Sequence, residues 1–356
     1  MDVLRGHRQE VWRSVLLPDH KTLVSGSKDG AVCFWDTSLP HSRQQRIAIP
    51  DKVVTWGITP DSRSIVALNH EGQVSQWSGG EFQQKTPLFE IGETFFARYN
   101  YYRFSPDARF LATGSTNGVL QVWDISRRLL RRQWSDTAGE VWPGVFLAGG
   151  NKLVTISMAD HLHREWDLAS GLQVQSWRSP AEFSGAINVS PDERSCLALG
   201  YGGDVVLRNL AEQSDMNAPL DALESTAANF SPDGKLFAVA SDMGYARVWN
   251  TATWQQVATL GGVLNGVNSA RFSADGKRLV VASNGNEAVK LYDTESWQEV
   301  FTLGASGTGF KGAMFSPDGN TIVWGNQTGD VYIWRAPSWE EIAAAEAKEK
   351  AESRQP

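Results

Sequence analysis

Two histidines and a glutamate occupy alternate positions in the stretch "HLHREWD" at residues 161–167. Side chains two residues apart in an extended strand share one face, so His163 and Glu165 point the same way. Imidazole and carboxylate groups bind zinc, but a zinc site needs three or more protein ligands, and only His161 is nearby, at an expected turn. Two interpretations stay open: a buried, satisfied polar pair, which we favour, or a metal site.

Other catalytic patterns lack the context that their chemistry requires. The sequence "GTGFKG" at 307–312 matches a phosphate-binding pattern in form, but it links two expected strands and precedes no helix. No P-loop, HExxH, CxxC or GxSxG pattern occurs in the chain. We therefore predict that the protein is not an enzyme and uses no cofactor and no catalytic or structural metal.

Composition narrows the classes of partner. The 33 basic and 40 acidic residues give a net charge of −7, so no overall positive field attracts nucleic acid. The two cysteines, Cys33 and Cys196, are too few for a disulfide framework and suit a reducing compartment. No apolar run approaches the length of a membrane span. We expect a cytoplasmic protein that binds neither nucleic acid nor membrane.

The chain consists of repeated units of about 42 residues. A turn sequence related to "SPDG" recurs in every unit, and an aromatic residue or its replacement follows about 17 residues later. The turn series is Pro18, Pro60, Pro106, Ala148, Pro191, Pro232, Ala274 and Pro317, and the second series is Trp35, Trp77, Trp123, Trp166, Arg208, Trp249, Tyr292 and Trp334. Both series predict eight units.

Each unit reads as an antiparallel meander of short strands. Pro presets φ for the first turn position and Gly accepts a positive φ at its end, so "SPDG" favours a tight hairpin between two apolar strands. A third strand ends at the aromatic residue, and a run such as "WQQVATL" or "WQEVFTL" supplies a fourth. Four strands per unit, without sustained 3.6-residue periodicity, indicate propeller blades.

The first unit carries Gly6-His7 followed by "LLPDHKTLVSGSKDGAVCFWD", and "FSPDARFLATGSTNGVLQVWD" occurs in the third. These units resemble WD-repeat β-propeller blades, and the resemblance extends from about residue 1 to 335. It implies an all-β WD-repeat β-propeller. The repeat count predicts eight four-stranded blades, whereas seven is the commonest number in the family, so both numbers stay open. We divide the chain into a propeller at residues 1–337 and a short helical or disordered charged tail at 338–356.

A closed ring requires a complete last blade, because an unfinished one leaves an unpaired edge. We expect residues 2–5 to add the outer strand to the eighth blade. The sequence "WEEIAAA" at 339–345 is the competing candidate, but it continues into "AEAKEKAES", whose residues favour a helix.

The resemblance also implies a structural hydrogen-bonded tetrad in each blade. Only the first unit looks complete, with His7, Ser25 or Ser27, Asp29 and Trp35. The fifth unit has Arg208 in place of the tryptophan. We expect most blades to depend on packing instead.

WD-repeat propellers bind partners through residues around the start of the innermost strand and just before the turn aspartate. The resemblance implies that the equivalent residues of this chain lie at fixed positions in each unit. The candidates rich in aromatic and basic residues fall in the first five units: Trp12, Lys28, His70, Arg98, Asn100, Trp142, Phe183 and Tyr201. Trp and Arg dominate interface energetics, so this half is the expected docking surface. Trp12 and Trp142 could instead fill the central channel.

We predict a monomeric, non-enzymatic scaffold that binds a protein or peptide through one face of the propeller. One alternative is a regulatory module, because the ending "WRAPSWEEIAAAEAKEKAE" resembles the close of bacterial WD-repeat serine/threonine kinases, although no kinase signature is present. The other is the binding of a small ligand in the central channel.

Overall fold

The structure is a computed structural model of the 356-residue chain. It describes residues 11–16, 22–27, 32–36, 52–79, 82–91, 101–135, 139–178, 183–200, 205–218, 225–261, 266–284, 289–303, 310–326 and 330–335. For residues 11–16, 22–27, 32–36, 183–186 and 310–311 only the backbone is described.

The strands form eight antiparallel sheets, and each sheet pairs strands that follow one another in the chain. The first sheet contains β1 (Val11–Leu16), β2 (Thr22–Ser27) and β3 (Val32–Asp36). Six four-stranded sheets follow: β4 (Val53–Ile58), β5 (Ile65–Asn69), β6 (Gln73–Ser78) and β7 (Gln84–Glu90); β8 (Tyr102–Phe104), β9 (Phe110–Thr113), β10 (Val119–Asp124) and β11 (Leu129–Ser135); β12 (Val141–Leu147), β13 (Lys152–Ser157), β14 (Leu162–Asp167) and β15 (Gln173–Arg178); β16 (Phe183–Val189), β17 (Ser195–Gly200), β18 (Val205–Asn209) and β19 (Ser214–Asn217); β20 (Ser225–Phe230), β21 (Leu236–Ser241), β22 (Tyr245–Asn250) and β23 (Gln256–Leu260); β24 (Val267–Phe272), β25 (Arg278–Ser283), β26 (Val289–Asp293) and β27 (Glu299–Leu303). The last sheet contains β28 (Phe310–Phe315), β29 (Thr321–Asn326) and β30 (Val331–Arg335).

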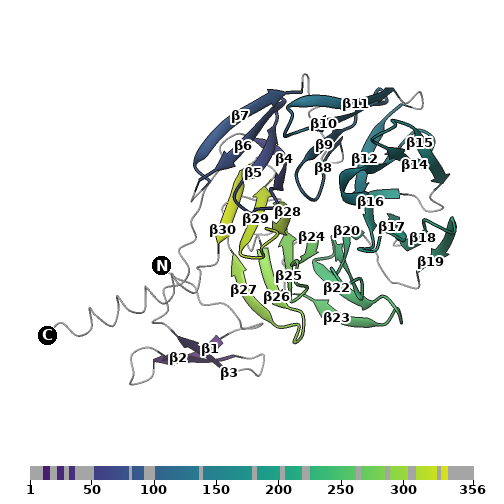
Figure 1. Ribbon diagram of the computed structural model, residues 1–356. Helices are drawn as coiled ribbons and strands as arrows, with labels where there is room; N and C mark the ends of the chain where they lie inside the picture. Colours follow the sequence, from purple (N-terminus) through teal and green to yellow (C-terminus); the bar gives the residue numbers. More distant parts are fainter. Residues whose placement is uncertain are drawn as a thin grey trace.

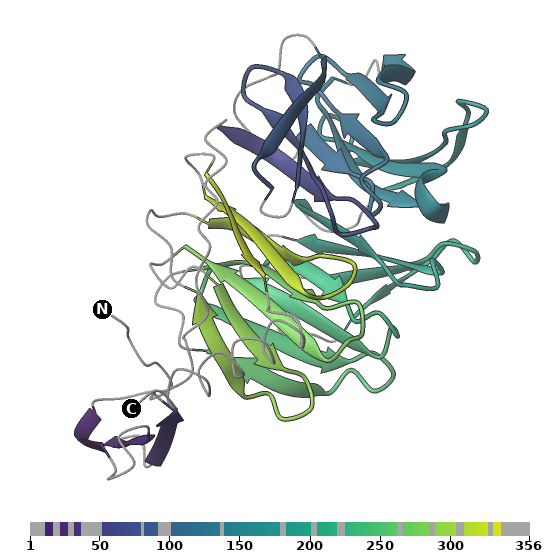
Figure 2. The same cartoon turned by 60° about the vertical axis from the view of Figure 1, so that its left-hand side comes forward.

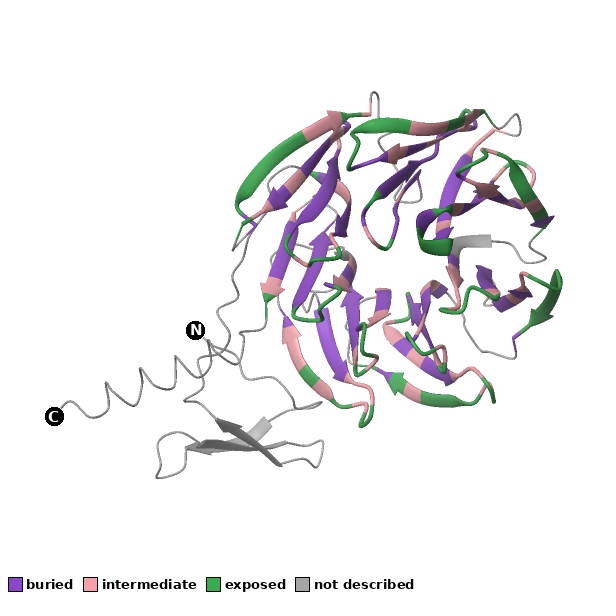
Figure 3. Cartoon of the chain, viewed as in Figure 1, coloured by how far each residue is buried: buried purple, intermediate pink, exposed green. Residues whose placement is uncertain are grey.

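Seven of these sheets stand around a common axis, with their first strands innermost (Figure 1). Burial follows this arrangement: all of β5 is buried, whereas β7 at the rim is mostly exposed. Figure 3 shows the same gradient from inner to outer strands around the ring. The continuous apolar runs of second strands, such as "LFAVAS" in β21, suit a strand covered on both faces.

The hairpins between first and second strands confirm the turn prediction. In the β24–β25 turn the Ser273 hydroxyl donates to Asp275 Oδ1 at 2.6 Å, and the Lys277 backbone N–H donates to the same oxygen at 3.0 Å. Gly276 has a φ of 72°, a conformation that glycine adopts without steric cost. The Ser or Thr to Asp bond recurs at residues 59–61, 105–107, 190–192, 231–233 and 316–318.

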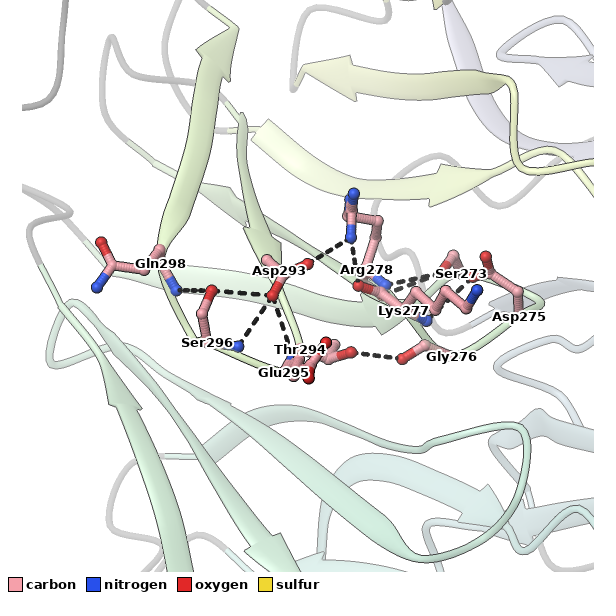
Figure 4. Close-up of polar contacts among 10 residues, drawn as sticks. All are labelled: Ser273, Asp275, Gly276, Lys277, Arg278, Asp293, Thr294, Glu295, Ser296 and Gln298. Atoms are coloured by element: carbon pink, nitrogen blue, oxygen red, sulfur yellow. Dashed lines mark hydrogen bonds and ion pairs between the residues drawn. The ribbon is translucent and has the colours of Figure 1, made fainter. Parts of the chain in front are cut away.

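A second turn supports the first within the same blade (Figure 4). Arg278 forms an ion pair with Asp293, which also accepts hydrogen bonds in the turn between β26 and β27. The Thr294 hydroxyl donates to the Gly276 carbonyl at 2.8 Å. These contacts join the two turns at one end of the blade.

The ring closes between the β28–β30 sheet and the β4–β7 sheet. Val323, Val331 and Ile333 share one buried apolar cluster with residues of the β4–β7 sheet. Across this closure the Asp318 backbone N–H donates to Ser62 Oγ at 3.1 Å, although the two residues are 256 positions apart in the sequence.

The prediction of eight blades is wrong, because the ring has seven blades. The β1–β3 sheet of the first unit lies outside the ring in both views (Figures 1 and 2). The repeat count gives the number of units with similar sequences. The number of blades in the ring depends instead on which sheets pack face to face. The proposed closing strands at 2–5 and 339–345 and the tail at 338–356 lie outside the described residues. The described residues contain no α-helix, and η2 (Ala148–Gly150) is a short 3₁₀ segment.

Candidate partner-binding face

One end of the ring is formed where the chain enters each inner strand. There the entering residue accepts a backbone hydrogen bond from the turn between the second and third strands of the same blade. These pairs are His70 to Lys52 at 3.1 Å, Met158 to Glu140 at 2.8 Å and Asn284 to Gly266 at 2.9 Å. We call the end defined by these six residues the entry face.

A carboxylate on the entry face holds two aromatic side chains together. Glu140 Oε1 accepts a hydrogen bond of 2.6 Å from the Tyr101 hydroxyl and one of 2.8 Å from Trp142 Nε1. The two rings pack edge to face, with centroids 6.3 Å apart. Trp142 is only 6% exposed and belongs to the largest apolar cluster. Its ring therefore packs in the interior, while Glu140 keeps partial contact with solvent.

A more exposed group lies on another blade of the same face. Met243, in the turn between β21 and β22, is 57% exposed. Tyr245 follows at the start of β22, and its hydroxyl lies 3.5 Å from Met243 Sδ. The Arg247 guanidinium carbon is 4.4 Å from the centre of the Tyr245 ring, a cation–π distance. Met, Tyr and Arg are enriched at protein interfaces.

The structure places only two of the predicted partner-binding side chains among its described residues, His70 and Trp142. His70 lies on the entry face. Trp142, on a different blade, follows the entry-face residue Glu140 by two positions, and its ring packs in the interior. Phe183 begins β16, opposite Gly200, and its side chain is not described. The other ring positions, Arg98, Asn100 and Tyr201, lie outside the described residues.

Three predicted residues of the first unit lie in the β1–β3 sheet, away from the ring (Figure 2). Trp12 lies in β1, Ser25 in β2 opposite Ser14, and Trp35 in β3 opposite Leu23. Lys28, His7 and Asp29 lie outside the described residues.

Sequence reasoning missed Tyr101, Met243, Tyr245 and Arg247. A fixed offset selects one position in each unit, so it chose Asn100, which is one residue away from Tyr101. The "MGYAR" segment at 243–247, where Met, Tyr and Arg alternate after a turn, was the available signal.

The histidine and glutamate of "HLHREWD" are buried, as predicted, at 0% and 3% exposure. Glu165 accepts hydrogen bonds from Lys152 Nζ at 2.8 Å and from Gln175 Nε2 at 2.6 Å. His163 instead stacks on Trp177, with centroids 5.5 Å apart and planes 13° apart. The carboxylate is satisfied by its lysine and glutamine neighbours. No group of three metal-ligating side chains occurs within the described residues.

Arg208 takes the place of a repeat tryptophan and packs against the neighbouring blade. Its guanidinium carbon lies 5.0 Å from the centre of the Trp177 ring, and the group pairs with Asp215 at 3.0 Å. Together with His163 and Cys196 these residues line a cavity of about 10 Å³ between two blades, room for about one water molecule.

Burial sets the protonation of this inter-blade cluster. It lowers the pKa of His163 to about 4, with a further contribution from the charge of Arg208. The same burial raises the pKa of the Cys196 thiol to about 12. A neutral imidazole and a protonated thiol make this cluster a packing element with little nucleophilic reactivity.

Few tetrad hydrogen bonds occur among the described residues of the ring. Trp166 Nε1 donates to Thr155 Oγ1 at 2.9 Å. The buried Nε1 atoms of Trp77 and Trp123 have no hydrogen-bond partner among the described residues. Trp123 is held by stacking on Phe89 at 5.6 Å. These two blades depend on packing at the repeat tryptophan.

Comparison with known proteins fits this architecture. The WD domain, G-beta repeat family (WD40) matches residues 1–36, 100–124 and 254–293. The matches support a WD-repeat propeller. Within the described residues, no helix is long and apolar enough to cross a bilayer.

Among three similar proteins, two have names that describe subunits. The LST8 homolog of Drosophila melanogaster is 30% identical over 113 residues, covering 30% of this chain and 36% of that protein. The target of rapamycin complex subunit LST8 of Mus musculus is 32% identical over 127 residues, 34% and 38% of the two chains. The guanine nucleotide-binding protein subunit beta of Solanum tuberosum is 24% identical over 308 residues, 79% and 80%. The matches to the LST8 proteins span little more than a third of those relatives' length.

Proposed function

We propose that the protein is a non-enzymatic scaffold that binds a protein or peptide partner through the entry face. The observation that carries the proposal is the group of exposed Met243 with half-buried Tyr245 and Arg247, because side chains of these types are enriched at interfaces. Two relatives whose names describe them as subunits of complexes add support.

His70 and the group of Glu140 and Trp142 belong to the same proposed surface. The partly exposed carboxylate of Glu140 offers a hydrogen-bond acceptor to a partner, while the buried rings of Tyr101 and Trp142 fix its position. Trp142 therefore acts by positioning Glu140. The remaining predicted residues, Trp12, Lys28, Arg98, Asn100, Phe183 and Tyr201, stay candidates for partner contact.

Affinity capture from the cells that produce the protein tests this proposal. The full chain serves as bait, and captured proteins are quantified by mass spectrometry. The variant Met243→Ala with Tyr245→Ala should reduce capture of the specific partner by about tenfold or more, as expected for interface anchors. Val257→Ala, at a 42% exposed position of the outer strand β23, is the matched control. Unchanged capture by the double variant, with a normal melting temperature, would contradict the proposal.

Further properties remain part of the proposal. The C-terminal sequence supports a regulatory role in bacterial signalling. Genes for signalling proteins next to the gene of this protein would support that role. Two widely spaced cysteines support a reducing, cytoplasmic location. We also propose a monomer, and light scattering after size-exclusion chromatography should give a mass near 39.2 kDa.

A further inference from the structure

Two arginines occupy equivalent positions on opposite sides of the ring axis. Arg103 lies in β8 and Arg271 in β24, and each precedes the serine of its hairpin turn, Ser105 or Ser273, by two residues. Figure 1 shows β8 and β24 facing one another across the centre of the ring. Equal positions in the repeat put the two arginines at the same level along the axis.

Neither guanidinium has a compensating carboxylate among the described residues. Both side chains keep partial contact with solvent, but Arg103 Nε is buried and lacks a hydrogen-bond partner in this part of the chain. Burial, and then the charge of Arg271, lowers the pKa of Arg103 to about 10. Burial also lowers the pKa of Arg271. The two like charges repel each other in a partly desolvated place.

The other inner-strand residues at this level are neutral and leave the two charges unbalanced. They are Gly57, Val145, Asn188, Asn229 and Met314. The two asparagines are already engaged: Asn188 Nδ2 donates to Asn229 Oδ1 at 2.7 Å, and Asn229 Nδ2 donates to the Ala270 carbonyl at 2.8 Å. These amides tie three inner strands together beside Arg271.

We propose that Arg103 and Arg271 together bind a small divalent oxyanion of the phosphate class near the ring axis. An arginine stays charged at any physiological pH, so its charge must be compensated by an anion when it loses water. Its planar fork of N–H donors matches the oxygens of phosphate. Two guanidiniums match the charge of one hydrogen phosphate. This site is separate from the proposed partner-binding group at Met243.

Inorganic phosphate added to the full chain tests the proposal by calorimetry and by thermal unfolding. We expect saturable binding with a Kd on the order of 1 mM or tighter, and a rise in Tm of about 3 °C at saturation, because a ligand of the folded state stabilises it. Chloride at equal ionic strength should give no such rise. Sulfate should compete with phosphate, because both are tetrahedral divalent oxyanions.

The variants Arg103→Met and Arg271→Met should each weaken phosphate binding at least tenfold. Each should be as stable as the wild type, or more stable, in phosphate-free buffer, because the repulsion is gone. Arg63→Met, at an exposed turn position, controls for the loss of one positive charge and should bind phosphate normally. Equal phosphate effects on all three variants and the wild type would show only general stabilisation by an excluded salt and would overturn the proposal. So would unchanged phosphate affinity in both ring variants. Neither result depends on partner capture.

Discussion

The indole ring of Trp56 occupies the space over Gly325, and this contact joins the first and last blades of the ring. A Cβ atom at residue 325 would lie 2.6 Å from Cη2 and from Cζ3 of Trp56, closer than carbon atoms approach. Trp56 is 8% exposed, in the apolar cluster that joins these two blades. The absence of a side chain at one position thus lets two sheets separated by most of the sequence pack together.

Gly325→Ala should therefore loosen the closure of the ring. Because the added methyl group forces Trp56 to move, we expect a loss of about 1–3 kcal/mol in the free energy of unfolding, measured by chemical denaturation. Gly261→Ala is the control, since a Cβ there meets nothing within 4 Å, and it should change stability by less than about 0.5 kcal/mol. Equal losses in the two variants would contradict this account of the closure.

A shortened chain that begins at residue 52 should still fold, because it contains all seven blades of the ring. The β1–β3 sheet lies outside the ring (Figure 1), so its removal leaves the seven blades and their closure intact. We expect a single cooperative transition in differential scanning calorimetry, with a Tm within a few degrees of the full chain. Loss of cooperative folding in the shortened chain would mean that the first unit is needed in the ring.

His163 should make stability depend on pH. Its pKa is about 4 in the folded protein and ordinarily 6.5, so the unfolded chain binds the proton more tightly between these values. The free energy of unfolding should fall as the pH drops from about 6.5 to 4, by on the order of 3 kcal/mol. His163→Phe preserves stacking on Trp177 and should remove this slope, measured by urea unfolding at several pH values.

His161→Asn is the matched control for that series. His161 is exposed and has a φ of 58°, a conformation that asparagine tolerates. This variant should keep the wild-type slope between pH 6.5 and 4. An identical slope in His163→Phe would show that other groups cause the dependence.

The turn aspartates should contribute to stability except at strongly acidic pH. The Ser273 hydroxyl and the Lys277 backbone N–H hold the pKa of Asp275 below its usual 3.8. A carboxyl with a lowered folded pKa stabilises the protein above the unfolded value and loses this effect as the pH falls through the folded value. Asp275→Ala should lower the free energy of unfolding by about 1 kcal/mol at pH 7.

At pH 2 the difference between Asp275→Ala and the wild type should shrink, because the wild-type carboxyl is then protonated. Asp275→Asn keeps an acceptor oxygen for Ser273 and should lose less than the alanine variant at pH 7. Equal stability of all three proteins at pH 7, measured by chemical denaturation, would show that this hydrogen bond is dispensable.

Turn conformations and the buried faces of strands, which depend on a few neighbouring residues, could be predicted from the sequence. Ser273, Asp275 and Gly276 form their turn as predicted, because a hydroxyl, a carboxylate and a residue that tolerates positive φ suffice to set it. Alternation within a strand also predicted the burial of His163 and Glu165. The partners of that glutamate, Lys152 and Gln175, lie on adjacent strands of the same blade.

The repeat by itself predicted an all-β propeller, because each short meander contains the turn residues and apolar strands that form a blade. Only the tertiary structure decided that seven blades close the ring, since closure depends on whether the faces of distant sheets fit, as Trp56 fits over Gly325. It also brought Arg103 and Arg271 to the same axis. Contacts between residues so far apart in the chain leave no local pattern to read, because they arise only when the sheets pack around a common centre.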